Sequence, residues 1–461
     1  MAEARKEKQV LLTITNLKKY FPVKNRELFS QEKLFVRANE DISINIYQGE
    51  TFGLVGESGC GKSTLGRVLL QLYHQTDGRT MYYGRTLDDL APNYVYDVYK
   101  HLKKHLQNAE KLRLHHAQLQ REFDALTDEK AKWAMQDKVI AARKAAEDAH
   151  VDIAKLVGGF AAAGNPSEVS PVLLREYQAA AKVFRTRDQI RKLRLEIESL
   201  REEGAKSADK LSRLEAKLRS LQASLEKQDR ALEELRSTIQ ALRARYADVP
   251  GFQQSEALRD DGVDLAKLTP SEMRLLRKDL QLIFQDPYSS LNPRMTVAQL
   301  IGEGLVAHEY YKMGSSKMQD YILKVMDNCG LAPYMMHRYP HQFSGGQRQR
   351  IGIARALALR PKFVVCDEAV SALDVSIQSQ VLNLLLDMKE KENLTYLFIS
   401  HDLSVIKYIS DRIGVMYLGN LVELADTEEM FAHPMHPYTE ALLGAIPTTD
   451  PDASKELVLI K

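Results

Sequence analysis

The spacing of hydrophobic and polar positions changes twice along the chain and divides it into three stretches. In residues 10–90, apolar and polar residues partly alternate, as in LLTITNLKKYF and KLFVRANEDISINIY. Such alternation predicts antiparallel strands with one solvated face. From about residue 262 onward, short apolar runs recur between helical stretches, a pattern typical of a mostly parallel α/β sheet. These runs are residues 282–284, 363–366, 396–400 and 413–418.

The middle stretch, residues 88–262, is rich in Ala, Leu, Glu, Lys, Arg and Gln and has a helical period. In its second part, fourteen apolar residues fall on one a/d heptad frame: Ile190, Leu193, Ile197, Leu200, Leu211, Leu214, Leu218, Leu221, Leu225, Leu232, Leu235, Ile239, Leu242 and Tyr246. Its first part has a weaker seam of five residues, each seven apart: Leu112, Leu119, Leu126, Trp133 and Ile140. Repeats of this length indicate a coiled coil.

A breaker segment rich in Gly and Pro, residues 158–171, separates the two seams. We therefore predict an antiparallel helical hairpin, in which a helix of about 55 residues would reach roughly 80 Å. The second frame is interrupted at Gly204 and Ser207 and by the polar Gln228. Heptads specify a helical partner without naming it, so an inert insertion packed on itself and a docking arm both remain open.

This pattern predicts one α/β domain in two pieces, interrupted by a helical insertion. We expect residues 1–87 and 263–430 to form the α/β domain, residues 88–262 the insertion, and residues 431–461 a C-terminal segment. The expected fold class is a mostly parallel α/β sheet with an antiparallel β subdomain and a helical subdomain.

Composition and charge exclude several classes of protein. The net charge is +2, so no bulk electrostatic attraction to nucleic acid is expected. The three cysteines, Cys60, Cys329 and Cys366, are isolated in sequence, which predicts neither a disulfide framework nor a metal-ligand cluster and fits a reducing cytoplasm. The N-terminal residues lack the apolar core of a signal peptide, and there is no run of about 18 apolar residues, so we expect a chain that does not span a membrane.

The segment GESGCGKST has the spacing of a phosphate-binding loop between a strand and a helix. Its glycines let successive N–H groups point inward at phosphate oxygens, and the helix N-terminus adds a favourable dipole. We expect Lys62 to neutralise the β- and γ-phosphates and Ser63 to bind Mg²⁺. The predicted nucleotide-binding residues are Gly56, Glu57, Ser58, Gly59, Cys60, Gly61, Lys62, Ser63 and Thr64.

The apolar run FVVCDE ends in two acids. Burial of the run as a strand would bring Asp367 to its C-terminal edge beside the phosphate loop, where the carboxylate can hold the Mg²⁺ shell. Glu368 can then polarise the attacking water as a general base. An isolated Asp-Glu pair is more often solvated than catalytic. Because this pair lies downstream of the segment SGGQ, we favour the catalytic interpretation.

SGGQ, together with the phosphate loop, resembles the ATP-binding cassette (ABC) family. In that family two cassettes form a dimer, and the signature of one closes over the ATP held by the other. The resemblance implies that Ser344, Gly345, Gly346 and Gln347 contact the opposite subunit's ATP. The segment SALD resembles the loop that communicates between the two sites, which comprises Ser371, Ala372, Leu373 and Asp374.

Three single residues also receive roles from this resemblance. Gln285 matches the loop glutamine that senses Mg²⁺ and couples to the membrane subunit. His401 matches the switch histidine that contacts the γ-phosphate. Phe21 lies where the family has an aromatic residue stacked on adenine, with Tyr20 as the competing choice. The implied catalytic residues are therefore Glu368, His401 and Gln285, and the implied Mg²⁺ ligands are Ser63, Gln285 and Asp367.

Longer segments resemble one branch of the family, the second ATPase of oligopeptide and dipeptide importers. They are FQDPYSSLNPRMTV, QRQRIGIARALALRPKFVVCDE, SALDVSIQSQVLNLL and HPYTEALLGAIP, and the resemblance extends over about 290 residues. It implies ATP and Mg²⁺ as ligands, a second cassette ATPase (identical or related), two transmembrane permease subunits and, indirectly, a substrate-binding protein. It also implies a cytoplasmic protein, peripheral on the inner face of the membrane, that binds no nucleic acid.

The chain departs from this branch in three respects. Ala369 stands where proline usually follows the two acids, no cysteine follows Cys366, and residues 88–262 are an unusual insertion. We therefore expect no iron–sulfur cluster. The alternative function is a soluble ABC ATPase with a coiled-coil arm that acts on a nucleoprotein or ribosomal partner. The insertion precedes Gln285 and is not markedly basic, and the chain has a single phosphate loop, which disfavours this alternative.

Overall fold

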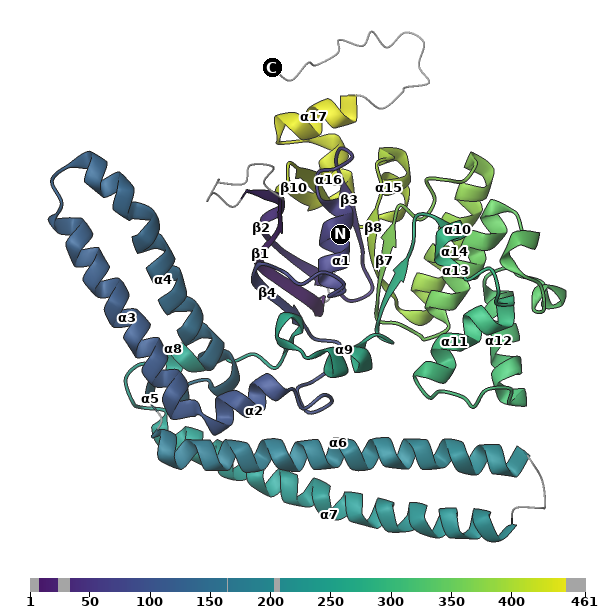
Figure 1. Ribbon diagram of the computed structural model, residues 1–461, viewed down its shortest axis with the longest axis horizontal. Coiled ribbons are helices and arrows are strands. Elements are labelled where there is room, and N and C mark those ends of the chain that lie inside the picture. Colours follow the sequence, from purple (N-terminus) through teal and green to yellow (C-terminus); the bar gives the residue numbers. More distant parts are fainter. Residues whose placement is uncertain (1–7, 24–33, 164, 203–207, 445–461) are drawn as a thin grey trace, which may run out of the picture. The chain divides into compact units, whose positions relative to one another are not determined.

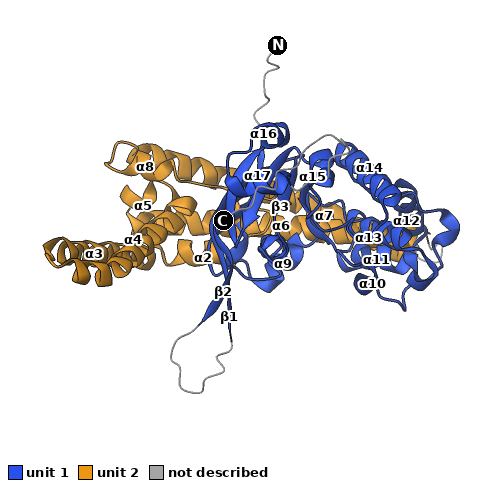
Figure 2. Ribbon diagram, turned by 90° about the horizontal axis from the view of Figure 1, so that it is seen from above, with its two compact units in different colours: residues 1–84, 264–461 blue, residues 85–263 orange. Residues whose placement is uncertain are grey.

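The computed structural model describes residues 8–23, 34–163, 165–202 and 208–444. The chain forms two compact units, which are coloured separately in Figure 2. Unit 1 comprises residues 1–84 and 264–461, and unit 2 comprises residues 85–263. Within the described ranges, no helix is both long enough and apolar enough to cross a membrane.

A six-stranded sheet forms the centre of unit 1, with the order β10-β9-β3-β8-β7-β6. Five strands run parallel, and only β10 is antiparallel to its neighbour β9. The mostly parallel sheet expected from the short apolar runs is thus confirmed. Its strands are β3 (Thr51–Val55), β6 (Leu280–Ile283), β7 (Phe363–Asp367), β8 (Thr395–Ile399), β9 (Arg412–Tyr417) and β10 (Asn420–Asp426).

A second, four-stranded sheet has the order β2-β1-β4-β5. β1 pairs antiparallel with β2 and with β4, and Ile42, Ile44 and Ile46 of β2 are buried while the residues between them are exposed. This alternation is the solvated-face pattern seen in the sequence. The strands are β1 (Val10–Pro22), β2 (Phe35–Tyr47), β4 (Asp77–Tyr82) and β5 (Val263–Asp264).

Helices cover the six-stranded sheet and form its main core (Figure 1). Phe398 and Val364 of the central strands and Ile351 of α13 are fully buried in this core. The helices of unit 1 are α1 (Lys62–Leu69), α9 (Pro270–Leu276), α10 (Pro287–Ser290), α11 (Val297–Ala307), α12 (Ser316–Asn328), α13 (Gly345–Leu357), α14 (Val375–Glu392), α15 (Leu403–Ile409), α16 (Thr427–Ala432) and α17 (Pro437–Gly444), with short 3₁₀ turns at Leu265–Lys267, Pro333–Met335 and Pro340–Gln342.

Unit 2 consists of helices, and its long helices form two hairpins (Figure 1). α3 packs against α4, and α6 packs against α7. Across the second hairpin, Arg187 pairs with Asp229 at 3.0 Å and Arg201 pairs with Glu215 at 2.7 Å, so the two helices run antiparallel. The helices are α2 (Asn93–Lys100), α3 (Leu102–Ala125), α4 (Glu129–Val157), α5 (Phe160–Ala163), α6 (Pro166–Glu202), α7 (Ala208–Tyr246) and α8 (Phe252–Glu256).

The prediction of a single hairpin with a helix of about 55 residues was wrong. The heptad frame of residues 190–246 is carried by two helices, because α6 ends at Glu202 and α7 begins at Ala208. Gly204 and Ser207, which interrupt the frame, lie outside the described residues. A heptad pattern has the same phase in one long helix and in two helices that fold back on each other, so spacing alone could not separate these cases. At 1.5 Å per residue, the 37 residues of α6 extend about 56 Å.

Candidate functional site

A cleft of about 820 Å³ in unit 1 brings together half of the residues proposed from the sequence. It lies at the carboxyl ends of β3, β6, β7 and β8, the edge at which parallel sheets commonly bind ligands. The proposed residues that line it are Phe21, Ser58, Gly59, Cys60, Gly61, Lys62, Ser63, Thr64, Gln285, Glu368 and His401.

The phosphate loop follows β3 and leads into α1, as expected from its sequence. Gly61 immediately precedes α1 and has a φ of 105°, a conformation that favours glycine. A Cβ atom at Gly61 would lie 2.0 Å from the carbonyl oxygen of Ala38, so a side chain there would collide with the backbone of β2. The loop is therefore held close against β2, with the N-terminus of α1 at the cleft.

Lys62 is buried and stays within the loop. Its Nζ atom donates to the carbonyl oxygens of Gly56, at 2.7 Å, and Glu57, at 2.8 Å. A lysine ammonium is a strong hydrogen-bond partner for a phosphate oxygen.

Two oxygen atoms suited to a magnesium ion meet beside Lys62. Ser63 Oγ donates to Asp367 Oδ1 at 2.5 Å, and Arg67 Nη2 lies 3.5 Å from Asp367 Oδ2. Asp367 ends β7 and is buried. Mg²⁺ prefers hard oxygen ligands and is commonly held by one or two protein groups together with substrate phosphates, so this hydroxyl–carboxylate pair fits the ion.

Glu368, Gln285 and His401 gather from the ends of three adjacent strands. Gln285 Nε2 donates to Glu368 Oε2 at 2.7 Å, and His401 Nδ1 lies 3.5 Å from the same oxygen. The backbone N–H of Glu368 donates to Ile399 O at 3.0 Å, which ties the residue to the end of β8. Ala369, the residue that departs from the family pattern, is buried directly after Glu368.

The two aromatic candidates for the adenine side have different environments. Phe21 lines the cleft, with the Tyr73 ring edge-on at 5.6 Å and Lys19 Nζ 4.7 Å from the centre of its own ring. Tyr20 instead donates its hydroxyl to the carboxylate of Glu40, with a shortest distance of 2.6 Å. Of the two, Phe21 is therefore the one available to a ligand in this cleft.

The signature residues and the SALD loop form their own local structure. Ser344 caps α13, accepting from the N–H of Gln347 at 3.3 Å and donating its own N–H to Gln347 Oε1 at 3.1 Å. Asp374 caps α14, and the N–H of Ile377 donates to its carboxylate, which lowers the pKa of Asp374. The cleft is lined neither by the signature residues nor by the SALD loop, that is, by none of Ser344, Gly345, Gly346, Gln347, Ser371, Ala372, Leu373 and Asp374.

Sequence reasoning missed two sets of residues around the loop. The first set lines the cleft from β2 and from the turn between β9 and β10: Val36, Arg37, Ala38, Leu418 and Gly419. The second set holds the loop by hydrogen bonds: Asn39 Nδ2 donates to Gly61 O at 3.1 Å, and the N–H of Glu57 donates to Tyr438 OH at 3.0 Å. Tyr438 lies in the segment HPYTEALLGAIP, but that segment does not indicate a contact with the loop; the other residues form no motif, so only the fold could reveal their positions.

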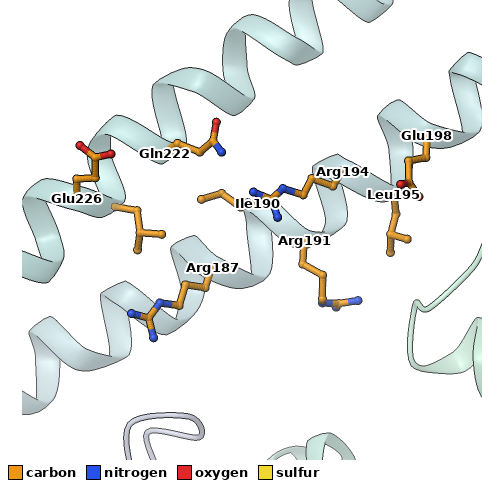
Figure 3. A pocket seen from close by; sticks show the side chains of 9 residues that line it. Arg187, Ile190, Arg191, Arg194, Leu195, Glu198, Gln222 and Glu226 are labelled. Atoms are coloured by element: carbon orange, nitrogen blue, oxygen red, sulfur yellow. The ribbon is translucent and has the colours of Figure 1, made fainter. Parts of the chain in front are cut away.

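A second hollow, of about 570 Å³, lies in unit 2 between α6 and α7 (Figure 3). Its lining combines the basic residues Arg187, Arg191 and Arg194 with Glu198 and Glu226. Arg187 and Arg191 are already engaged in ion pairs with aspartates. This mixture of exposed charges offers no group poised for catalysis, so the cleft of unit 1 is the candidate active site.

Comparisons with known proteins agree with the cleft's composition. The family model described as ABC transporter matches residues 39–162 and 237–371, which is more than half of the chain. The interruption of this match, residues 163–236, falls in the insertion. The model described as oligopeptide/dipeptide transporter, C-terminal region, matches residues 422–461, of which 445–461 lie outside the described part of the chain.

Curated relatives carry corresponding descriptions. The oligopeptide transport ATP-binding protein OppF of Bacillus subtilis is 58% identical over 181 residues, 39% of this chain and 59% of the relative. The dipeptide transport ATP-binding protein DppF of Lactococcus lactis is 54% identical over 196 residues, 42% of this chain and 62% of the relative. OppF of Escherichia coli is 52% identical over 194 residues, 42% of this chain and 58% of the relative.

The chain thus spans about three fifths of the length of the curated relatives it matches. Its phosphate loop, acidic strand end and signature segment lie on a mostly parallel sheet of the expected kind. On these grounds the chain belongs to the ABC transporter family.

Proposed function

We propose that this protein is the ATP-binding and ATP-hydrolysing subunit of an importer for oligopeptides or dipeptides. The observation that carries the proposal is the cleft lined by Lys62, Ser63 and Glu368, with Asp367 hydrogen-bonded to Ser63. The names of the relatives and the C-terminal family match support the transported class. They also favour this function over a cassette that acts on nucleoprotein or ribosomes.

Binding of ATP follows from the loop. The N–H groups at the start of α1 and the ammonium of Lys62 would hold the β- and γ-phosphates. Phe21 would stack on the adenine ring from the far end of the cleft. Ser63, Asp367 and Gln285 would hold Mg²⁺, which supplies charge neutralisation between the β- and γ-phosphates.

Hydrolysis requires a base beside the γ-phosphate, and Glu368 is the proposed base. Its carboxylate oxygen accepts from Gln285 at 2.7 Å, which would orient it toward a water molecule. His401, 3.5 Å from that oxygen and largely exposed, would contact the γ-phosphate as the switch residue. Catalysis would then rest on positioning and on charge stabilisation, the usual logic of phosphoryl transfer.

A second cassette would complete the site. The signature residues Ser344–Gln347 do not line the cleft of their own chain, which supports their action on the ATP of a partner. Gly345 and Gly346 start α13, so their N–H groups would meet the partner's γ-phosphate at a helix N-terminus. The partner would be a second copy or a related ATPase, and closure of the pair would drive two permease subunits, supplied with peptide by a binding protein. This assigns the chain to the cytoplasmic face of the membrane.

The proposed catalytic role is tested by Glu368→Gln, which keeps the size of the side chain and removes the base. Turnover should fall about 10²–10⁴-fold while ATP binding and ATP-dependent association persist. Phosphate release measures the first, and binding of a fluorescent ATP analogue measures the second. The exposed Glu390→Gln is the matched control and should leave both unchanged. Normal hydrolysis by Glu368→Gln would exclude Glu368 as the base.

The transport role is tested by affinity purification of the tagged chain from detergent-solubilised membranes. Recovery of two multi-spanning permeases and a second cassette ATPase is expected. Recovery from the soluble fraction with ribosomal or DNA-associated proteins would contradict the importer and favour the alternative.

A further inference from the structure

A tyrosine from the C-terminal segment contacts the phosphate loop from outside the cleft. The hydroxyl of Tyr438 accepts from the backbone N–H of Glu57, the second residue of the loop, at 3.0 Å. These residues are 381 positions apart in the chain, and Tyr438 lies in the region that matches the C-terminal family model. Tyr438 is 4% exposed, and its burial raises the pKa of the phenol, so the neutral hydroxyl persists at physiological pH.

The residues around Tyr438 fix its direction. His436 Nδ1 accepts from the N–H of Tyr438 at 3.1 Å, which caps the start of α17, and Pro437 is the first residue of that helix. The carboxylate of Glu423 on β10 accepts from the N–H groups of Met435 at 2.8 Å and His436 at 3.0 Å. The His-Pro-Tyr segment is therefore held in place by hydrogen bonds to the edge strand of the six-stranded sheet.

The aromatic ring of Tyr438 is also held from the side. Its centre lies 4.4 Å from that of Tyr417, the last residue of β9. The backbone of β9 itself abuts the loop, because a Cβ atom on Gly56 would lie 2.1 Å from the carbonyl oxygen of Met416. Tyr438 thus reaches the loop from a rigid strand end rather than from a free terminus.

The peptide that Tyr438 holds is the one that Lys62 uses. The N–H of Glu57 donates to Tyr438, and the carbonyl oxygen of the same peptide unit, that of Gly56, accepts from Lys62 Nζ at 2.7 Å. Lys62 Nζ also donates to Glu57 O at 2.8 Å and lies 3.6 Å from Cys60 Sγ, so its three donors are engaged and a bond to a phosphate requires that at least one contact be given up. The hydrogen bond from Glu57 to Tyr438 does not involve Lys62 and survives that change.

We propose that Tyr438 is a positioning residue that holds the phosphate loop in its nucleotide-binding conformation and so couples the C-terminal segment to ATP affinity. The inference rests on the proposed function only in that the cleft binds ATP. The loop conformation is needed equally in the ground state and in the transition state, so loss of the contact should weaken binding with little effect on the chemical step.

The test is Tyr438→Phe, which removes only the hydroxyl, with Tyr417→Phe as the matched control on the neighbouring ring. Tyr438→Phe should raise KM for ATP about two- to tenfold, the range expected for one hydrogen bond, with kcat within about twofold of the wild type. Tyr417→Phe should leave KM unchanged. The melting temperature of the two variants should agree, which separates positioning from a general loss of stability.

Dissociation constants measured in the Glu368→Gln background, with and without Tyr438→Phe, check the same shift without hydrolysis. An unchanged affinity on loss of the Tyr438 hydroxyl, or an equal rise for both tyrosine variants, would overturn the inference while ATP binding by the parent chain stands. Absence of ATP binding by the wild-type chain would overturn the proposed function, and the inference with it.

Discussion

At the scale of single residues, functional residues could be predicted where they are adjacent in the sequence. They could not be predicted where the fold brings distant residues together. Lys62 and Ser63 are adjacent in a loop whose glycine spacing already requires a phosphate-binding conformation. Arg37 lines the cleft from β2, and Tyr438, at the start of α17, accepts a hydrogen bond from the loop. Both contacts depend on tertiary packing, which the local sequence around Arg37 or Tyr438 does not encode.

The three thiols provide a prediction at this scale. Burial raises the pKa of Cys329 to about 12, despite the opposing charge of Arg350, and burial also raises the pKa of Cys366. Both therefore remain protonated and unreactive in the folded chain, even at pH 9. Cys60 is also buried, at 6% exposed, but it lines the cleft, so native alkylation should label this thiol alone, and ATP should protect it.

Mass spectrometry of iodoacetamide-treated protein measures the labelling. The Cys60→Ser variant should take up no label until denaturant is added, after which the other two thiols react. Native labelling of Cys329 or Cys366 would contradict their burial.

At the scale of elements, strands were easier to predict than the arrangement of helices. A short, continuous apolar run is typical of a strand buried on both faces, as in a parallel sheet, so β7 and β8 were recognisable from hydrophobicity. The heptad frame of residues 190–246 correctly indicated buried seams, since Ile197 and Leu232 are buried, but not the number of helices. The decision between one helix and two depends on the turn, which the seam does not encode.

Gln228, the polar residue that interrupts the heptad frame, is hydrogen-bonded across the hairpin, and this contact gives a second prediction. Thr186 Oγ1 on α6 donates to Gln228 Oε1 on α7 at 2.9 Å, and Gln228 Nε2 donates to Ser224 Oγ at 3.0 Å. A polar pair inside a seam commonly fixes the register of the two helices. Gln228→Ala should therefore destabilise the hairpin by about 1–2 kcal/mol, because buried Thr186 loses its partner.

Urea unfolding followed by circular dichroism measures this change. Gln222→Ala, six residues earlier on the same helix and without a hydrogen bond to α6 among the described contacts, is the control. Equal losses in the two variants would mean that the cross-helix bond contributes nothing specific.

At the scale of the whole molecule, the insertion begins after β4 and ends at β5, which are neighbours in one sheet. Neighbouring strands lie about 4.8 Å apart, so a few residues suffice to join them. Replacement of residues 88–262 by a short Gly/Ser loop should therefore leave unit 1 folded, with an ATP dissociation constant within about twofold of the full chain. Isothermal titration of both proteins tests this, and a folded variant that binds no ATP would show that the insertion belongs to the cassette core.

The attachment of the insertion between two neighbouring strands also affects how related cassettes can diverge in sequence. The sheet holds both ends of the segment together, and the entropic cost of closing a loop rises only slowly with the length of the loop. Selection can lengthen, duplicate or exchange the intervening helices without reoptimising the nucleotide site. This junction is thus a point at which an ABC cassette can acquire an additional domain while its nucleotide site stays unchanged, and related cassettes are free to differ there altogether.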